Sequence, residues 1–93
     1  MIRSFRCGKT ERLFQRERVK EFANIATVAL RRLVALDSAQ TLSDLLVPPS
    51  NRLEELTGDR KGQHSIRIND QYRICFTWRQ GSAEDVEITK HYR

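Results

Sequence analysis

The apolar residues in the first half of the chain recur with the period of a helix. Spacings of three and four residues connect Phe22, Ile25, Ala29, Leu33 and Leu36. These spacings place the side chains on one face and predict a long helix over residues 22–36. The polar pair that follows residue 36 is expected to end this helix.

Two shorter helical segments are expected on either side of the long helix. The first covers residues 10–20, with Leu13 and Phe14 buried. The hydroxyl of Thr10 is expected to accept a hydrogen bond from an amide at the start of this helix, where amides lack helical partners. The second is a single turn at residues 41–46, which is ended by Pro48 and Pro49.

After residue 51 the period of the apolar residues changes to two. This alternation predicts strands over residues 52–56, 63–69, 72–79 and 84–90, with a further short strand at 2–6. Strand, helices and then a run of antiparallel strands predict an α+β fold. An antiparallel sheet of four to five strands would pack on two to three helices. Residues 1–93 are expected to form a single domain.

Because side chains alternate along a strand, each residue can be assigned to one face of the sheet. The face expected to contact the helices carries Ile66, Ile68, Tyr72, Ile74, Phe76, Trp78, Val86 and Ile88. The opposite face, called the arginine face below, carries Ser65, Arg67, Asn69, Arg73, Cys75, Thr77, Arg79, Glu87, Thr89, His91 and Arg93.

A three-residue loop between the strands at 63–69 and 72–79 would place Arg73 opposite Arg67 or Asn69. Like charges directly across a strand pair are destabilising. Two interpretations of Arg67, Arg73 and Arg79 therefore remain open. Either these arginines bind an anion, or they form a solvated face that Glu87 partly neutralises.

The chain carries a formal net charge of +5, and the first 20 residues account for it with seven basic and two acidic side chains. A basic balance favours polyanionic partners. The first helix could therefore meet an acidic macromolecule or an acidic protein, or it could present a solvated basic surface.

Several classes of protein do not fit the sequence. Two cysteines without zinc spacing predict a reduced, cytoplasmic protein with no structural metal. The absence of a signal-like segment and of an apolar run of about 18 residues argues against export and membrane insertion. No glycine-rich nucleotide loop or nucleophile elbow occurs, and no cofactor is expected.

A histidine among arginines is suited to acid–base chemistry at phosphorus. His91 falls on the arginine face, whereas His64 has the parity of the core residues and is expected to be structural. Imidazole titrates near neutral pH, and guanidinium can hold a phosphate by two parallel bonds. Without a metal, the available reaction is attack by the 2′-hydroxyl of RNA on the adjacent phosphorus, which would spare DNA. Arg60 and Lys61 either cap the turn "GDRKG" or hold RNA phosphate.

The segments "NRLEELTGDRKGQHSIRINDQYRICFTW" and "DVEITKHYR" resemble the HigB-type toxins of the RelE/ParE superfamily, also called the plasmid maintenance killer family. The opening "MIRSF" and the leucine-rich middle helix extend the similarity over nearly the whole chain. The resemblance implies a fold like that of small microbial ribonucleases. It also implies a bacterial toxin that cleaves messenger RNA in the ribosomal decoding site, with contacts to 16S rRNA. The implied inhibitor is a helix-turn-helix antitoxin of the HigA type, encoded beside the toxin.

The resemblance also implies roles for individual residues. Arg73 matches the arginine that these enzymes place at the scissile phosphate. Related toxins commonly end with Asp-Tyr-His, whereas this chain ends with Lys90, His91, Tyr92 and Arg93. The resemblance therefore implies His91 as proton donor or acceptor and Tyr92 as stacking or hydroxyl partner. A histidine that some relatives place before the "GDR" turn is replaced here by the Glu54–Thr57 region.

The leading hypothesis is a ribosome-dependent mRNA endonuclease of a type II toxin–antitoxin system. Its expected catalytic residues are Arg73, His91 and Tyr92. The expected RNA-binding residues are Arg60, Lys61, Arg67, Arg79, Lys90 and Arg93. Two alternatives act by binding alone: a DNA gyrase poison of the same superfamily, and a ribosome-binding protein that no longer cleaves RNA.

Overall fold

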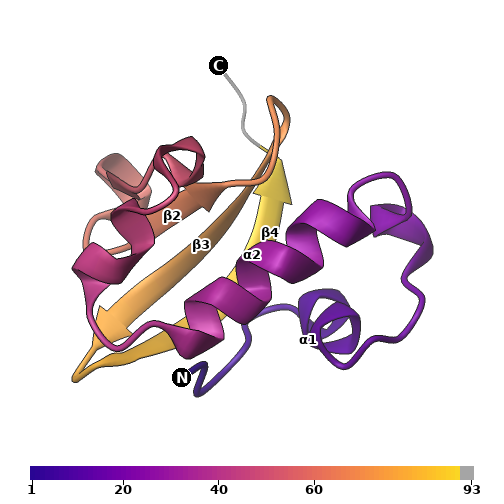
Figure 1. Ribbon diagram of the computed structural model, residues 1–93, viewed down its shortest axis with the longest axis horizontal. Helices are drawn as coiled ribbons and strands as arrows, with labels where there is room; N and C mark the ends of the chain where they lie inside the picture. Colours follow the sequence, from indigo (N-terminus) through magenta and orange to yellow (C-terminus); the bar gives the residue numbers. More distant parts are fainter. Residues whose placement is uncertain (91–93) are drawn as a thin grey trace.

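The computed structural model describes residues 1–90 of the chain (Figure 1). Four antiparallel strands form one sheet in the order β1-β2-β3-β4. Their bounds are Glu54–Glu55 for β1, His64–Arg67 for β2, Tyr72–Arg79 for β3 and Ser82–Lys90 for β4. Two α-helices, α1 (Gly8–Phe14) and α2 (Ala26–Ser38), accompany the sheet. Short 3-10 helices are η1 (Lys20–Phe22), η2 (Leu42–Leu46), η3 (Pro49–Asn51) and η4 (Gly58–Arg60). The predicted α+β fold is confirmed.

The core lies between the sheet and α2, which crosses in front of β3 and β4 in Figure 1. Ala29, Leu33 and Leu36 of α2 are fully buried, as are Ile74 and Phe76 of β3. The predicted apolar face of the sheet therefore contacts the helices. Burial of these side chains is the main favourable contribution to folding.

The two hairpins follow from local backbone chemistry. Ile68 donates its amide to the carbonyl of Tyr72, which closes the odd-numbered loop that the sequence predicted. Between β3 and β4 the two turn residues, Gln80 and Gly81, both have positive φ. This is the two-residue turn that matches the right-handed twist of paired strands.

A bulge in β4 changes the arginine face. Cys75 pairs with Glu87, whereas Thr77 pairs with Glu84, so β4 carries one extra residue between these pairs. Asp85, inside the bulge, has φ 53°. Simple alternation would separate Glu84 from Glu87, but the bulge brings both carboxylates to the arginine face.

The amino-terminal segment pairs with the outer edge of β4 instead of forming the predicted strand at 2–6. Ile2 and Phe5 make two isolated parallel bridges to Ala83 and Val86. The amides of Ala83 and Val86 donate to the carbonyls of Met1 and Ser4 at 2.9 and 3.1 Å. An exposed strand edge is a site of unwanted pairing, and this segment covers it.

The prediction for Thr10 was wrong. Helix α1 starts at Gly8 and ends at Phe14, so Thr10 lies inside the helix and not at its start. Its buried hydroxyl accepts a hydrogen bond from the amide of Ile88 at 3.0 Å. This amide is the next one on the β4 edge beyond the amino-terminal segment, and a buried amide needs a partner. The hydroxyl of Thr10 therefore satisfies a backbone amide of the edge strand β4 instead of one at the start of α1.

Other predicted boundaries also change. The long helix begins at Ala26, because residues 20–22 form η1 and Ile25 takes the position before the helix. The predicted turn at 41–46 is η2, closed by reciprocal hydrogen bonds between Thr41 and Asp44. Strand β1 spans only two residues of the predicted 52–56.

Candidate functional site

Arg73 lies near the start of β3 on the arginine face, and only 8% of the residue is exposed. Its Nε donates to Ser65 Oγ at 2.7 Å, and its Nη2 donates to the carbonyl of Arg52 at 2.8 Å. Nη2 also lies 3.2 Å from a carboxylate oxygen of Glu54, whose side chain is half exposed. Hydrogen bonds that involve a charged group are stronger than neutral ones. Arg73 is therefore held in one orientation from three directions.

The segment before β1 supplies the Arg52 carbonyl, and β1 itself supplies Glu54. Arg52 has φ 45° and ψ 56°, the left-handed region that residues with a Cβ seldom adopt. The buried Asn51 anchors the segment by donating to the carbonyls of Leu45 and Val47. Strained backbone of this kind persists only where its surroundings hold it. Here the strained turn directs the Arg52 carbonyl to Arg73.

One nitrogen of Arg73 remains available. Guanidinium has five N–H donors, and within residues 1–90 Nη1 donates to no acceptor. An anion on the arginine face could therefore bind Nη1 without displacing the internal partners. The orienting contacts would make such binding directional.

Arg67 and Arg73 are directly opposed across β2 and β3, as one of the predicted registers required. Their repulsion is reduced because each contacts its own carboxylate: Arg67 pairs with Asp70, and Arg73 pairs with Glu54. Arg79 lies at the far end of β3, 3.8 Å from Glu84. Arg79 therefore lies apart from the opposed pair Arg67 and Arg73, because six positions of β3 separate it from Arg73.

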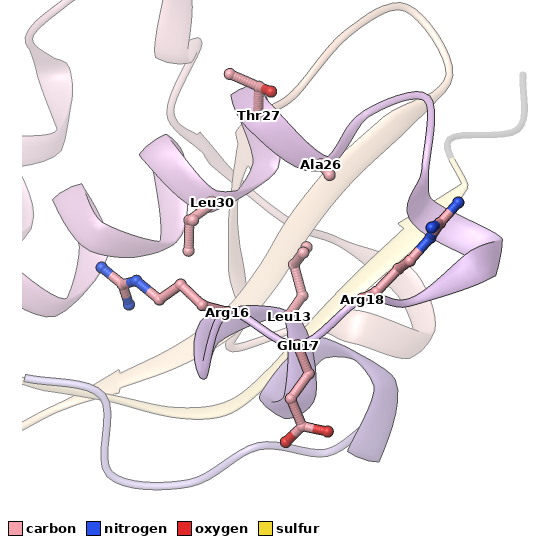
Figure 2. Close-up of a pocket in the computed structure, with 7 residues that line it drawn as sticks. All are labelled: Leu13, Arg16, Glu17, Arg18, Ala26, Thr27 and Leu30. Atoms are coloured by element: carbon pink, nitrogen blue, oxygen red, sulfur yellow. The ribbon is translucent and has the colours of Figure 1, made fainter.

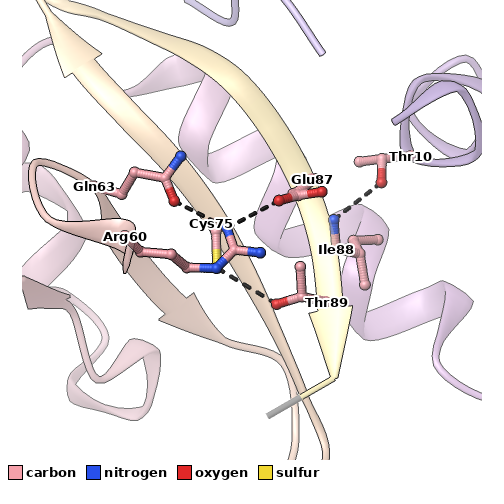
Figure 3. A network of polar contacts seen from close by, with 7 residues as sticks. All are labelled: Thr10, Arg60, Gln63, Cys75, Glu87, Ile88 and Thr89. Carbon is pink, nitrogen blue, oxygen red and sulfur yellow. Dashed lines mark hydrogen bonds and ion pairs between the residues drawn. The ribbon is translucent and has the colours of Figure 1, made fainter. Parts of the chain in front are cut away.

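Arg60 connects the "GDR" turn to the sheet (Figure 3). Its Nη1 donates to Glu87 Oε1 and to Gln63 Oε1, both at 2.9 Å. The Glu87 side chain is only 16% exposed, so this ion pair is partly shielded from water. Glu87 thus neutralises Arg60, and not the arginines of β2 and β3. Arg60 holds η4 against the arginine face.

A hollow of about 340 Å³, called the basic hollow below, lies between η4, β3 and the amino-terminal segment. It is lined by Arg6, Asp59, Arg60, Lys61, Gly62, Gln63, Thr77 and Arg79. Three of the predicted RNA-binding residues, Arg60, Lys61 and Arg79, therefore lie together. Arg6 joins them, although the sequence grouped it with the basic first helix. The sequence does not reveal that Phe5 pairs with β4, and this pairing places Arg6 beside the hollow.

Of the two histidines, only His64 lies within the described residues. His64 lies on the helix side of β2, and its ring stacks on Phe76 with centroids 6.1 Å apart. Its Nδ1 is buried without a hydrogen-bond partner in the described part of the chain. His91, Tyr92 and Arg93 lie outside the described residues. Lys90, the last described residue, pairs with Tyr72 and places its Nζ 5.9 Å from the centre of that ring.

A second, mainly apolar hollow of about 260 Å³ lies between α1 and the start of α2 (Figure 2). Leu13, Ala26 and Leu30 form its apolar surface, and Arg16 and Arg18 extend on either side. The remaining lining residues are Glu17 and Thr27. In Figure 2 the Glu17 carboxylate points away from α2. This hollow, called the helix groove below, therefore combines an apolar floor with two cationic flanks.

Residues 1–90 contain no group of three or more His, Cys, Asp or Glu side chains arranged to hold a metal ion. Within the same part of the chain, no helix is long and apolar enough to cross a membrane. Cys7 and Cys75 are free thiols.

Solved structures with the same fold include a YoeB-YefM toxin–antitoxin complex. A YoeB-YefM complex from Staphylococcus aureus superposes with a TM-score of 0.62 at 19% identity, covering 99% of both chains. YafQ from E. coli strain BL21(DE3) superposes with a TM-score of 0.56 at 12% identity, covering 98% of this chain and 94% of that one. These proteins share the RelE-like toxin fold.

Sequence comparison defines the family more closely. The family described as "RelE-like toxin of type II toxin-antitoxin system HigB" matches residues 3–91. Toxin HigB-1 of Vibrio cholerae serotype O1 is 45% identical over 69 residues, which cover 74% of this chain and 73% of that protein. The chain therefore belongs to the HigB-like toxin family of type II toxin–antitoxin systems, as the resemblance implied.

Proposed function

We propose that this HigB-like toxin cleaves messenger RNA on the ribosome by attack of the RNA 2′-hydroxyl on the adjacent phosphorus. The observation that carries the proposal is the fixed guanidinium of Arg73, a residue of the arginine face whose Nη1 donates to no acceptor within residues 1–90. A preoriented cation stabilises charge that develops on a phosphate oxygen in the transition state. Such preorganisation requires no metal or cofactor.

In the proposed reaction, the 2′-oxygen forms a bond to phosphorus while the bond to the 5′-oxygen breaks. One group removes the proton of the 2′-hydroxyl, and another donates a proton to the departing 5′-oxygen. The products carry a 2′,3′-cyclic phosphate and a 5′-hydroxyl. We assign His91 to proton transfer and Tyr92 to stacking or hydroxyl donation. They follow Lys90 in the sequence, and Lys90 pairs with the neighbour of Arg73.

Cationic side chains around this centre would bind RNA phosphates of the message and of 16S rRNA. The proposed set is Arg60, Lys61, Arg67, Arg79, Lys90 and Arg93. Phosphate contacts position a protein on nucleic acid without reading its sequence. Arg60 and Arg67 already pair with carboxylates, so Lys61, Arg79 and Lys90 are expected to contribute more.

We further propose that a helix-turn-helix antitoxin inhibits the protein and contacts the helix groove. The groove offers an apolar floor between two arginines, which is complementary to an amphipathic segment with acidic flanks. The Leu30→Glu substitution places a negative charge on this floor and should weaken antitoxin binding by at least tenfold while leaving toxicity unchanged. Isothermal titration with the purified antitoxin measures the affinity. Unchanged affinity would exclude the helix groove as the contact.

A toxin that acts by binding alone is the second candidate. The observation in its favour is that every described contact of Arg73 is internal, as expected for an arginine that supports the fold. A gyrase poison and a ribosome-binding protein both belong to this second class.

Mapping of RNA ends after induction of the toxin separates the candidates. The nuclease should produce breaks with 5′-hydroxyl ends within translated messages. Ribosome-bound messages with a 2′-deoxy nucleotide at the cleavage position should stay intact in vitro. Growth arrest without message breaks would refute cleavage. DNA damage signalling would then indicate a gyrase poison, and stalled intact messages would indicate a ribosome binder.

A further inference from the structure

We propose that the basic hollow is a second phosphate-binding site, which holds the RNA backbone at a distance from the scissile phosphate. This inference rests on the proposed function for its choice of ligand, but its geometry is independent of Arg73. Four cationic side chains and one carboxylate line the hollow. It would therefore take an anionic ligand.

Three separate parts of the chain build the basic hollow. The bridge between Phe5 and Val86 places Arg6 beside β4, and the amide of Arg6 donates to the carbonyl of Val86 at 3.0 Å. The Arg60–Glu87 ion pair fixes the η4 turn and thereby positions Lys61. Arg79 closes the hollow from the end of β3. Because the four cations come from three separate segments, the hollow is a product of the fold and not of a local charge run.

The cations of the hollow differ in how far they are already neutralised. Arg60 pairs with Glu87 at 2.9 Å. Arg6 and Lys61 are exposed and form no ion pair within residues 1–90, and the 65% exposed Arg79 approaches Glu84 only to 3.8 Å. Three cations are therefore available to a ligand. Arg60 acts as the support that holds the turn.

Spacing favours RNA backbone as the ligand. Arg73 and Arg79 are six positions apart on one strand, which corresponds to about 20 Å at about 3.3 Å per residue. One phosphate cannot span this distance, so the two sites would hold different phosphates of an extended strand. Exposed cations around an open hollow also match the repeated charge of a polynucleotide, whose binding releases counterions. Thr77 and Gln63 add polar side chains to the lining.

A charge-matched pair of triple variants tests the site. The test variant carries Arg6→Gln, Lys61→Gln and Arg79→Gln. The control carries Arg12→Gln, Lys20→Gln and Arg31→Gln, three exposed cations outside the lining of the basic hollow. Fluorescence anisotropy with a short single-stranded RNA, and pelleting with vacant 70S ribosomes, give the binding constant over a range of salt concentrations. Single-turnover cleavage of a ribosome-bound message gives the rate at saturation.

The test variant should bind RNA several-fold more weakly than the control. Log K falls as log salt rises, and each lost phosphate contact makes this slope less steep by about 0.7–0.9. The slope for the test variant should therefore be less steep than that for wild type by about 2–3. The control variant should cleave at the wild-type rate at saturation, because none of its three substitutions lies in the proposed catalytic or RNA-binding set. A loss with the short RNA assigns the site to the message, and a loss with vacant ribosomes alone assigns it to ribosomal RNA.

Equal slopes for the test and control variants with both ligands would overturn the inference. Loss of antitoxin binding with RNA binding unchanged would also overturn it, because the surface would then be a protein interface. These failures differ from failure of the nuclease proposal. In that case the wild-type protein cleaves nothing, while the binding slopes still report on the basic hollow.

Discussion

The contact between Arg73 and Ser65 gives a direct test of how the arginine face is built. Ser65 is fully buried on β2, and its hydroxyl accepts from Nε of Arg73 at 2.7 Å. The Arg73→Ala substitution removes this donor and leaves the hydroxyl without its partner. Arg73→Ala should therefore lower the stability of the protein as well as any activity.

The structure indicates the size of the effect. A buried polar group that loses its partner costs about 1–3 kcal/mol. Loss of the ion pair with the half-exposed Glu54 adds only about 0–1 kcal/mol, because water screens it. Loss of packing by the buried stem of the side chain adds to both terms. We expect a total of about 2–4 kcal/mol, and each kcal/mol lowers Tm by about 4–8 °C for a domain of this size.

A double-mutant cycle of Arg73→Ala and Ser65→Ala, measured by urea unfolding, isolates the contact. Hydrogen bonds to charged groups contribute about 1.5–3 kcal/mol, and the coupling energy should fall in that range. If the two single effects add to within about 0.5 kcal/mol, the residues are independent. That result would refute the conclusion that Ser65 orients Arg73.

Three further predictions concern the scaffold. Thr10→Val keeps the shape of the side chain but removes the acceptor of the buried Ile88 amide, so urea unfolding should show a loss of about 1–3 kcal/mol; an unchanged midpoint would contradict this role. The amides of Gln40 and Thr41 lower the pKa of Asp44, so Asp44 stabilises the fold above its ordinary pKa. The stability difference between wild type and Asp44→Ala should therefore be full at neutral pH and shrink as the pH falls below about 4; a difference that is independent of pH would contradict it. Gln80→Asn creates the preferred Asn-Gly turn at a residue with φ 51° and should raise stability by roughly 0.5–1 kcal/mol, whereas a loss in thermal unfolding would argue against the turn type.

The faces of the sheet could be predicted from the sequence because side-chain alternation depends only on local geometry. Ile66, Ile74 and Phe76 are buried against the helices, and Arg73 lies on the opposite face. The same rule, with a loop of odd length, left Arg73 opposite either Arg67 or Asn69, and in the structure its partner is Arg67. Patterns of period two and 3.6 are strong where a segment is long and one side is buried.

Features that depend on contacts between distant segments could not be predicted. The role of Thr10 depends on an amide 78 residues away. The place of Arg6 in the basic hollow depends on pairing of the amino terminus with β4. The bulge at Asp85 has no glycine to reveal it, and it alone brings Glu84 to the arginine face. Each of these features depends on tertiary structure, and no periodic pattern in the sequence indicates it.

The carboxylate partners of Arg67 and Arg73 are the main feature of the site that could not be predicted from the sequence. Glu54 and Asp70 lie in irregular or very short segments, where alternation gives no register. Without these carboxylates, the sequence indicates two unpaired positive charges at Arg67 and Arg73. With them, Arg73 is an oriented donor, which suits transition-state stabilisation better than a loose cluster would.

The central claim is that Arg73 stabilises a phosphate during cleavage of RNA. Its most direct test is the single-turnover rate of message cleavage on the ribosome by the Arg73→Gln variant, measured at a temperature where circular dichroism shows it folded. Removal of one preoriented donor typically slows catalysis by about 10²–10³-fold, and we predict a loss of this size relative to wild type. Cleavage by the folded variant at the wild-type rate would contradict the account.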